Sequence, residues 1–118
     1  MKVFITGGAG FVGGHLSETF LEAGHDVEIL DDLSTGSIEN IEHLKGRKGF
    51  SYTIDTVMNE SLTAELIDRA DVVVHLAAIL NPPKGATREF LHDVDVKGTQ
   101  NVLRACLEAG VKKFVYTS

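Results

Sequence analysis

Several features are scarce or missing in this 118-residue chain, and each absence excludes a class of protein. A single cysteine cannot form an internal disulfide. No apolar run is long enough to span a bilayer, and the start, Met1-Lys2-Val3, lacks the pattern of a signal peptide. The basic residues are scattered and the formal net charge is −6, which argues against a nucleic-acid partner. We therefore expect a cytoplasmic protein that binds neither membranes nor nucleic acids.

Residue clusters for metal or triphosphate chemistry are also missing. No group of His, Cys, Asp and Glu has the spacing of metal ligands, and no glycine turn ends in the Lys-Ser or Lys-Thr pair of a triphosphatase loop. The one cysteine, Cys106, stands in a helical stretch without a His or Cys partner nearby. We expect a buried structural thiol there rather than a reactive one.

Strand and helix patterns alternate along the whole chain, without repeats or a proline-rich linker. Apolar stretches predict five strands, near residues 2–6, 26–30, 50–55, 71–77 and 113–117. The segments between them predict a helix after the first strand, a short helix or irregular piece at 38–44, and helices at 61–69 and 87–109. This alternation is typical of a parallel sheet with helices on both faces. Right-handed crossovers then give one Rossmann-type doubly wound α/β domain with strand order 3-2-1-4-5.

Glycines at a fixed spacing join the first expected strand to the first helix. The segment reads Thr6-Gly7-Gly8-Ala9-Gly10-Phe11-Val12-Gly13. Gly7 can take the positive φ of a tight turn, Gly10 lets a phosphate approach the backbone, and Gly13 lets the helix pack close to the strand. The positive end of that helix then meets an anion, so the turn predicts a pyrophosphate site. A purely structural turn and a methyltransferase-like adenosine site are the alternatives.

Acidic residues follow the second expected strand. That strand leads into Asp31 and Asp32, and no Lys or Arg follows before Lys45. A carboxylate at this place accepts hydrogen bonds from the ribose hydroxyls of NAD, whereas the 2′-phosphate of NADP would be repelled. The sequence therefore predicts NAD as the cofactor.

Further motifs, in order along the chain, resemble one known family. They are Asp31-Asp32-Leu33-Ser34-Thr35-Gly36, His75-Leu76-Ala77-Ala78, Val94-Asp95-Val96-Lys97-Gly98-Thr99-Gln100-Asn101 and Val115-Tyr116-Thr117-Ser118. With the glycine turn, they make the chain resemble the extended short-chain dehydrogenase/reductase group, specifically its NAD-dependent epimerase/dehydratase members that act on nucleotide sugars. The loop 31–36 most resembles that of nucleotide-sugar 4-epimerases. The segment 93–118 also resembles 3β-hydroxysteroid dehydrogenases and dihydroflavonol reductases.

The resemblance implies a set of NAD-binding residues. Phe11 and Val12 would contact the pyrophosphate through their backbone, and Asp31 would hold the adenosine ribose. Asp55 would lie near the adenine amine, and residues 76–78 along the nicotinamide ribose, although packing or turn formation is an alternative for these positions. The implied set is Gly7, Gly10, Phe11, Val12, Gly13, Asp31, Asp32, Ser34, Thr35, Gly36, Asp55, Thr56, Leu76, Ala77, Ala78 and Asp95.

Two of these positions depart from the family pattern. Asp95 stands where the family generally has asparagine, and an ionised aspartate accepts hydrogen bonds but cannot donate them. If it were buried near the cofactor, it would need a donor such as Lys97 or a water. Thr56 stands where the family often has an aliphatic residue.

His75 lies in an apolar strand, where a hydrogen-bonded core histidine is expected rather than a ligand.

The catalytic residues of the family are not found in the chain. They are a Ser or Thr just after the fifth strand and a Tyr-x-x-x-Lys on the next helix, which exchange a proton while hydride moves to NAD. Tyr52 is followed at that spacing by Thr56, the corresponding position for Tyr116 lies beyond Ser118, and Ser118 itself falls one place before the usual hydroxyl.

We therefore expect residues 1–118 to be the NAD-binding part of a nucleotide-sugar epimerase or dehydratase, without its catalytic Tyr and Lys or its substrate-binding region, and inactive alone. The alternatives are part of a 3β-hydroxysteroid dehydrogenase-like or dihydroflavonol reductase-like oxidoreductase, and a non-catalytic module that senses dinucleotides through a partner. Strand 113–117 would be an open apolar edge, and helix 87–109 resembles half of a dimer-forming helix pair. A homodimer or further self-association is therefore expected.

Overall fold

The computed structural model describes residues 1–33, 36–76, 85 and 87–116, with only the backbone described for residues 90–94. Its elements, in chain order, are β1 (Lys2–Thr6), α1 (Phe11–Glu22), β2 (Asp26–Asp31), the 3₁₀ turns η1 (Ile38–Asn40) and η2 (Glu42–Leu44), β3 (Phe50–Ile54), α2 (Glu60–Asp68), β4 (Val72–His75), α3 (Arg88–Ala109) and β5 (Lys113–Tyr116). Each expected strand and helix is present, with ends that differ by one or two residues where they are described.

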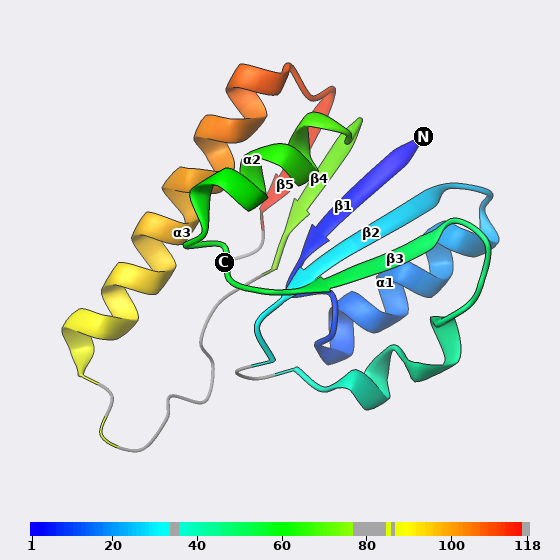
Figure 1. Cartoon of the computed structure of the whole chain (residues 1–118), viewed down its shortest axis with the longest axis horizontal. Helices are drawn as coiled ribbons and strands as arrows, with labels where there is room; N and C mark the ends of the chain where they lie inside the picture. The colour runs from blue at the N-terminus through cyan, green and yellow to red at the C-terminus, as the bar shows by residue number, and fades with distance from the viewer. Residues whose placement is uncertain (34–35, 77–84, 86, 117–118) are drawn as a thin grey trace.

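The strands form one parallel sheet in the order β3-β2-β1-β4-β5 (Figure 1). Strand β1 lies in the middle, with Ile5 opposite Ile29 of β2 on one side and Val74 of β4 on the other. This arrangement confirms the expected Rossmann-type doubly wound fold. The chain winds away from β1 in both directions, so the switch point of the sheet lies where β1 and β4 end, and ligands of such sheets bind at that point.

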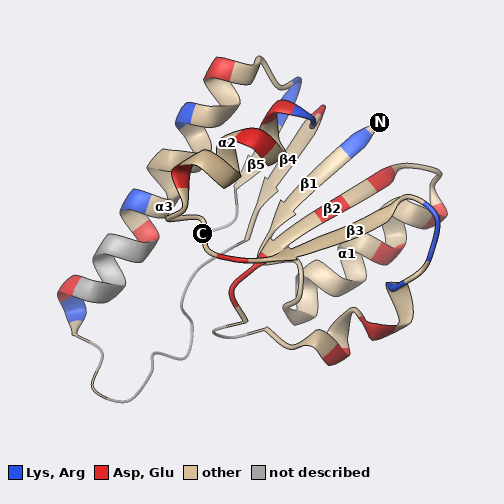
Figure 2. Cartoon of the chain, viewed as in Figure 1, with Lys and Arg blue, Asp and Glu red and all other residues tan. Residues whose placement is uncertain are grey.

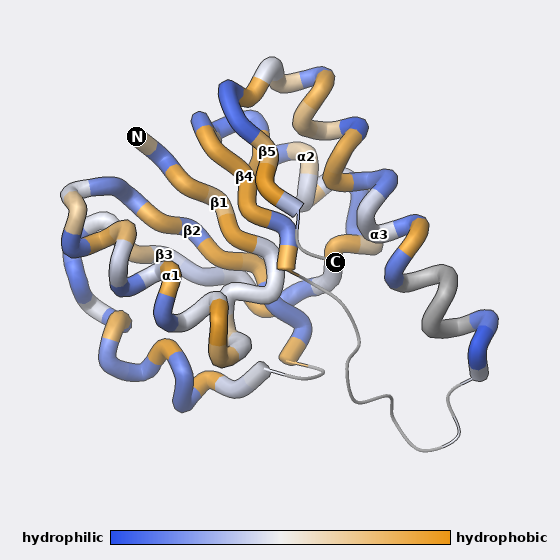
Figure 3. The backbone as a smooth tube through the Cα atoms, turned by 180° about the vertical axis from the view of Figure 1, so that it is seen from behind, coloured by the Kyte–Doolittle hydropathy of each residue, from blue (hydrophilic) through white to orange (hydrophobic). Residues whose placement is uncertain are grey.

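Helices cover both faces of the sheet because successive side chains of a strand point to opposite faces. Hydrophobic colouring runs along β1, β2 and β4 in Figure 3. One face packs against α1 and the 3₁₀ turns, with these residues buried: Val3, Ile5, Ala9, Leu21, Val27, Ile29, Ile41, Leu44 and Val74. The other face packs against α2 and α3, with these residues buried: Phe4, Leu30, Val57, Leu66, Ile67, Val73, Val102, Ala105 and Cys106.

Cys106 is buried within the second of these clusters. Burial raises the pKa of its thiol to about 11, because the thiolate would lose its hydration. The expected burial of this thiol is therefore confirmed. Among the described residues, none of the helices is long and apolar enough to cross a membrane.

A buried acid interrupts the apolar pattern of β2. Glu28 is only 6% exposed, and its Oε1 lies 3.8 Å from Lys2 Nζ and 3.6 Å from Arg69 Nη2. A buried carboxylate is tolerated when opposite charges compensate it. Glu28 therefore links the start of β1 electrostatically to the end of α2.

We predict that the buried core contributes most of the stability of the chain. Leu30 is 1% exposed, so Leu30→Ala should leave a cavity in the core and lower the free energy of unfolding by about 2–5 kcal/mol. The matched change Leu107→Ala, at a position 83% exposed in the single chain, should change it by no more than about 0.5 kcal/mol at a protein concentration low enough to prevent self-association. Urea unfolding followed by circular dichroism measures both, and equal losses would contradict the described core.

Candidate functional site

The turn between β1 and α1 is shaped by backbone contacts. Gly7 has a φ of 74°, and its N–H donates to the Leu30 carbonyl at 2.7 Å. A Cβ at Gly13 would lie 2.5 Å from the Gly7 carbonyl oxygen, closer than atoms can approach, so α1 packs against the turn only because this residue has no side chain. A Cβ at Gly10 would meet the same oxygen at 3.4 Å, which is an ordinary contact. The expected positive φ of Gly7 and close approach of Gly13 are confirmed.

Helix α1 begins without a capping side chain. Its N-cap is Gly10, and its first turn contains no acidic residue. The first N–H groups of a helix have no acceptor within the helix, and the dipole adds positive potential there. Phe11 and Val12, in this first turn, are 75% and 57% exposed. The start of α1 therefore offers backbone donors that no side-chain cap occupies.

Asp31 ends β2 and reaches this turn. Its Oδ2 accepts from the Ala9 N–H at 2.9 Å and its Oδ1 from the Leu33 N–H at 2.7 Å. Burial raises the pKa of Asp31 above its ordinary value, and the Asp32 charge acts in the same direction, while the two backbone hydrogen bonds oppose the rise. A carboxylate has about four acceptor sites, so these two bonds leave room for further donors.

The backbone at Ala9 is held from a second side. Its carbonyl accepts from the Asn40 side-chain amide at 2.8 Å and from the Ser37 N–H at 3.0 Å. Gly36 lies against both partners, because a Cβ there would be 2.8 Å from the Ala9 carbonyl oxygen and 3.0 Å from Asp31 Oδ2. The structure thus brings Gly36 to Asp31 as expected, and it adds Asn40 and Ser37, which sequence reasoning missed.

The end of β4 is tied to β1 through His75. The Leu76 N–H donates to the Thr6 carbonyl at 3.0 Å and to its Oγ1 at 3.1 Å. The ring of His75 is 1% exposed and lies between two hydroxyls, with Nδ1 2.6 Å from Thr6 Oγ1 and Nε2 3.0 Å from Thr99 Oγ1. Burial lowers the pKa of His75 to about 4, against the opposing charge of Asp95. The expected hydrogen-bonded core histidine is confirmed.

Other expected site residues lie around this centre. The Asp55 N–H donates to the Asp31 carbonyl at 3.1 Å, and the Asp55 carboxylate accepts from the Thr56 N–H at 2.7 Å. Asp32 is exposed, and so is Asp95 on α3. The case of a buried Asp95, which would need a hydrogen-bond donor, therefore does not arise. Ser34, Thr35, Ala77, Ala78 and Ser118 lie outside the described residues.

The charge distribution is uneven around the glycine turn. Figure 2 shows Asp and Glu colouring where β2 and β3 end, and the Lys and Arg colouring of the described residues lies elsewhere. In the part of the chain that the structure describes, no group of three or more His, Cys, Asp and Glu could hold a metal ion. Within the described part of the chain, the backbone dipoles of the turn are therefore what would attract an anion there.

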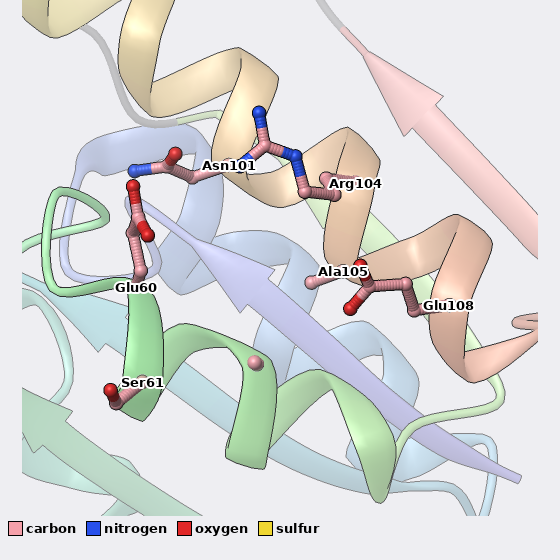
Figure 4. Close-up of a pocket in the computed structure, with 7 residues that line it drawn as sticks. Glu60, Ser61, Asn101, Arg104, Ala105 and Glu108 are labelled. Carbon is pink, nitrogen blue, oxygen red and sulfur yellow. The ribbon is translucent and has the colours of Figure 1, made fainter.

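A separate groove of about 330 Å³ lies between α2 and α3 (Figure 4). Its lining residues are Glu60, Ser61, Ala64, Asn101, Arg104, Ala105 and Glu108. The Glu60 and Asn101 side chains extend across it from the two helices (Figure 4). None of the lining residues belongs to the glycine turn or to the ends of the strands.

Comparison with known proteins identifies the family. Residues 4–118 match the 3-beta hydroxysteroid dehydrogenase/isomerase family. The chain belongs to this family.

Members and neighbours of the family include nucleotide-sugar enzymes. The chain is 36% identical to UDP-N-acetyl-alpha-D-glucosaminuronate decarboxylase of Bacillus cytotoxicus, covering 99% of this chain and 36% of that protein. It is 36% identical to UDP-glucose 4-epimerase of Mycolicibacterium smegmatis, covering 100% and 38%. The structure of the Bordetella bronchiseptica enzyme WbmG in complex with NAD superimposes with a TM-score of 0.87 at 32% identity, covering 98% and 36%. These matches confirm the resemblance to epimerases and dehydratases, and the chain spans little more than a third of each relative.

We predict that His75 makes the folded chain less stable in acid. The pKa is about 4 in the folded chain against an ordinary 6.5, so between these values the unfolded chain binds more protons. The stabilisation is complete above pH 6.5 and is lost as the pH falls towards about 4, by about 3 kcal/mol.

Urea unfolding between about pH 7 and pH 4 tests this, with His75→Gln as the comparison in which the histidine-dependent loss is absent. Ring proton resonances of His75 provide a second measurement that needs no variant. They should not titrate above about pH 5, and a midpoint near 6.5 would contradict the prediction.

Proposed function

We propose that residues 1–118 form the NAD-binding domain of an NAD-dependent nucleotide-sugar epimerase or dehydratase. The observation that carries this proposal is the uncapped start of α1 held beside the Asp31 carboxylate. The first offers donors to a pyrophosphate, and the second offers an acceptor to a ribose. In doubly wound folds a dinucleotide presents its pyrophosphate to the first helix and its adenosine ribose to an acid after the second strand.

The pyrophosphate is proposed to lie on the first turn of α1. The backbone N–H groups of Phe11, Val12 and Gly13 donate to it, and the helix dipole favours its charge. The protein itself leaves ordinary space for a Cβ at Gly10, so packing does not explain a glycine there. Close approach of a phosphate to the Gly10 backbone does explain it.

The adenosine half is proposed to lie beyond Asp31. The remaining acceptor sites of its carboxylate take the ribose hydroxyls, and the nearby Asp32 repels a 2′-phosphate. The proposed residues of this half are Asp31, Asp32, Ser34, Thr35, Gly36, Asp55 and Thr56. Those of the nicotinamide half are Leu76, Ala77, Ala78 and Asp95.

NAD supplies a hydride acceptor when it is bound, and an epimerase or dehydratase with this domain would use it to oxidise a nucleotide-sugar carbon transiently. The matches to UDP-sugar enzymes support this reaction. The family match itself favours a second candidate, an oxidoreductase that acts on a 3β-hydroxysteroid. The open reading frame that contains these residues should be assayed with UDP-glucose and with such a steroid. An altered UDP-sugar supports the first candidate, and steroid-dependent NADH formation supports the second.

The same proposal includes a cytoplasmic location and self-association. Exposed apolar side chains on the outer side of α3 and on β5 support the second point, because a partner copy would cover them. They are Val96, Leu103, Leu107, Val115 and Tyr116.

We predict that the chain binds NAD more tightly than NADP and that Asp31→Ala weakens NAD binding by about 1–3 kcal/mol. Calorimetric titration with both cofactors measures this. Asp26→Ala, at the opposite end of β2, is the matched control and should leave the affinity unchanged. Tighter binding of NADP by the wild type would refute the preference. A loss in Asp31→Ala that is equal for both cofactors would mean that Asp31 acts only through the Ala9 turn.

We also predict that two glycine substitutions separate binding from folding. Gly10→Val should abolish NAD binding in a folded chain, because its side chain fills the phosphate space. Gly13→Ala should instead destabilise the fold, because its Cβ would lie 2.5 Å from the Gly7 carbonyl oxygen. Circular dichroism and titration of the same samples distinguish the two effects. NAD binding retained by Gly10→Val would make the turn purely structural.

A further inference from the structure

His75 lies where three structural elements meet. It is the last residue of β4, opposite Thr6 of β1 in the sheet register, and its ring reaches Thr99 of α3. Thr6 directly precedes the glycine turn, and Leu76 is the next residue after β4. The set of NAD-binding residues that the resemblance implies contains neither His75 nor the two threonines, although all three lie within the motifs that carry the resemblance.

The hydroxyl protons determine the tautomer of this ring. The Thr99 hydroxyl has one proton and donates it to the Asp95 carbonyl at 2.6 Å. Thr99 Oγ1 must therefore accept from the His75 ring, which puts the proton on Nε2. In a neutral imidazole the other nitrogen is then an acceptor, so the Thr6 hydroxyl donates to Nδ1. Thr6 Oγ1 in turn accepts from the Leu76 N–H.

The result is a continuous chain of hydrogen bonds in one direction. It runs from the Leu76 N–H through Thr6, His75 and Thr99 to the Asp95 carbonyl. Its members lie on β1, β4 and α3, which are far apart in the sequence. If the proton were on Nδ1 instead, two donors would face each other between the ring and the Thr6 hydroxyl. Two acceptors would then face each other between the ring and Thr99 Oγ1.

The chain of hydrogen bonds reaches α3 near its middle. Among the residues of α3 whose side chains are described, the apolar cluster residues Val102, Ala105 and Cys106 lie in its C-terminal half and Gly98 is buried near its middle, and the ribbon of the N-terminal half extends away from the sheet (Figure 1). Near the junction of the halves, Gly98 packs against Val57, where a Cβ would lie 2.7 Å from Val57 Cγ2. The hydrogen bond from His75 to Thr99 adds a directional link from this part of α3 to the sheet.

We propose that His75, as the Nε2–H tautomer, is a positioning residue that fixes α3 and Leu76 relative to the glycine turn and thereby raises the affinity of the dinucleotide site. The inference rests on the proposed NAD binding and deepens it. Leu76 starts the segment proposed for the nicotinamide ribose, and Asp95 is the α3 residue proposed beside it. Their backbone groups are the two ends of the chain of hydrogen bonds.

If His75 acted through packing alone, NAD affinity would not depend on the Thr99 hydroxyl. The ring of His75 stacks on Tyr116 at 5.7 Å between centroids and on Phe114 at 6.4 Å. If only these contacts mattered, removing a hydroxyl from Thr99 would have no effect on the ring's protons or on NAD. The positioning role requires that hydroxyl.

Thr99→Val tests the proposal because it removes the hydroxyl and keeps the side-chain shape. Thr63→Val is the matched control, since Thr63 Oγ1 is buried on α2 without a hydrogen-bond partner. Thr99→Ser restores the hydroxyl. The readouts are the ¹⁵N shifts of the His75 ring in the free chain and the NAD affinity by calorimetry.

The wild type, Thr63→Val and Thr99→Ser should show protonated Nε2 and similar NAD affinity. Thr99→Val should show a mixture of tautomers and an affinity that is about 3- to 10-fold lower. A protonated Nδ1 in the wild type would overturn the proposal, and so would wild-type affinity in Thr99→Val. If the wild type did not bind NAD at all, the proposed function would fail, and this inference with it, whereas binding that ignores Thr99 would overturn this inference alone.

Discussion

The close approach of α1 to the turn before it is the contact on which the rest of the site depends. At Gly13 the helix lies so near that a Cβ would be 2.5 Å from the Gly7 carbonyl oxygen. Gly8 extends the same constraint to β2, because a Cβ there would lie 2.4 Å from Ile29, and Gly14 extends it to η1, where a Cβ would lie 2.9 Å from the Asn40 carbonyl oxygen. These glycines let the turn, α1, β2 and η1 come together because none of the glycines adds a side chain of its own. The N–H groups at the start of α1, which have no acceptor within the helix, consequently lie beside the end of β1, and the shape of the turn is set by the main chain.

Among the described residues of the site, backbone hydrogen-bond donors rather than Lys or Arg side chains compensate the charge of Asp31. Asp31 is an anion placed beside a turn that we propose binds another anion, and its burial raises the cost of its charge. The hydrogen bonds from Ala9 and Leu33 compensate, since bonds to a charged group contribute about 1.5–3 kcal/mol each. The same carboxylate therefore does two things: it orients the Ala9 peptide and it leaves acceptor sites for a ribose. Asn40 and Ser37 hold the other side of that peptide, so the β2–β3 connection contributes directly to the geometry of the turn.

Most of the fold could be predicted from sequence because its signals are local. Runs such as Val72-Val73-Val74 and the glycine spacing after Thr6 give strand positions and a turn without knowledge of distant contacts, and the crossover rule then gives the strand order. The polar contacts inside the site could not be predicted in the same way. Asn40 is 31 residues from Ala9, and Thr6 is 69 residues from His75, so nothing in the local pattern marks them as partners. Asp95 shows the same limit, because its place in a family motif left open whether it is buried, and the structure shows that α3 leaves it exposed.

The central place of β1 in the sheet has a consequence for biosynthesis. Strand β1 ends at Thr6 and its partner β2 begins at Asp26, but its other partner, β4, begins only at Val72. At synthesis rates of about 5–20 residues per second, the β1–β2–β3 half must wait for seconds with one edge of β1 unpaired. During that interval α3, which follows β4 in the chain, cannot yet cover the side chains of Phe4 and Leu30. The nascent chain thus leaves one edge of its central strand unpaired until β4 is synthesised, and the arrival of β4 completes the pairing of β1.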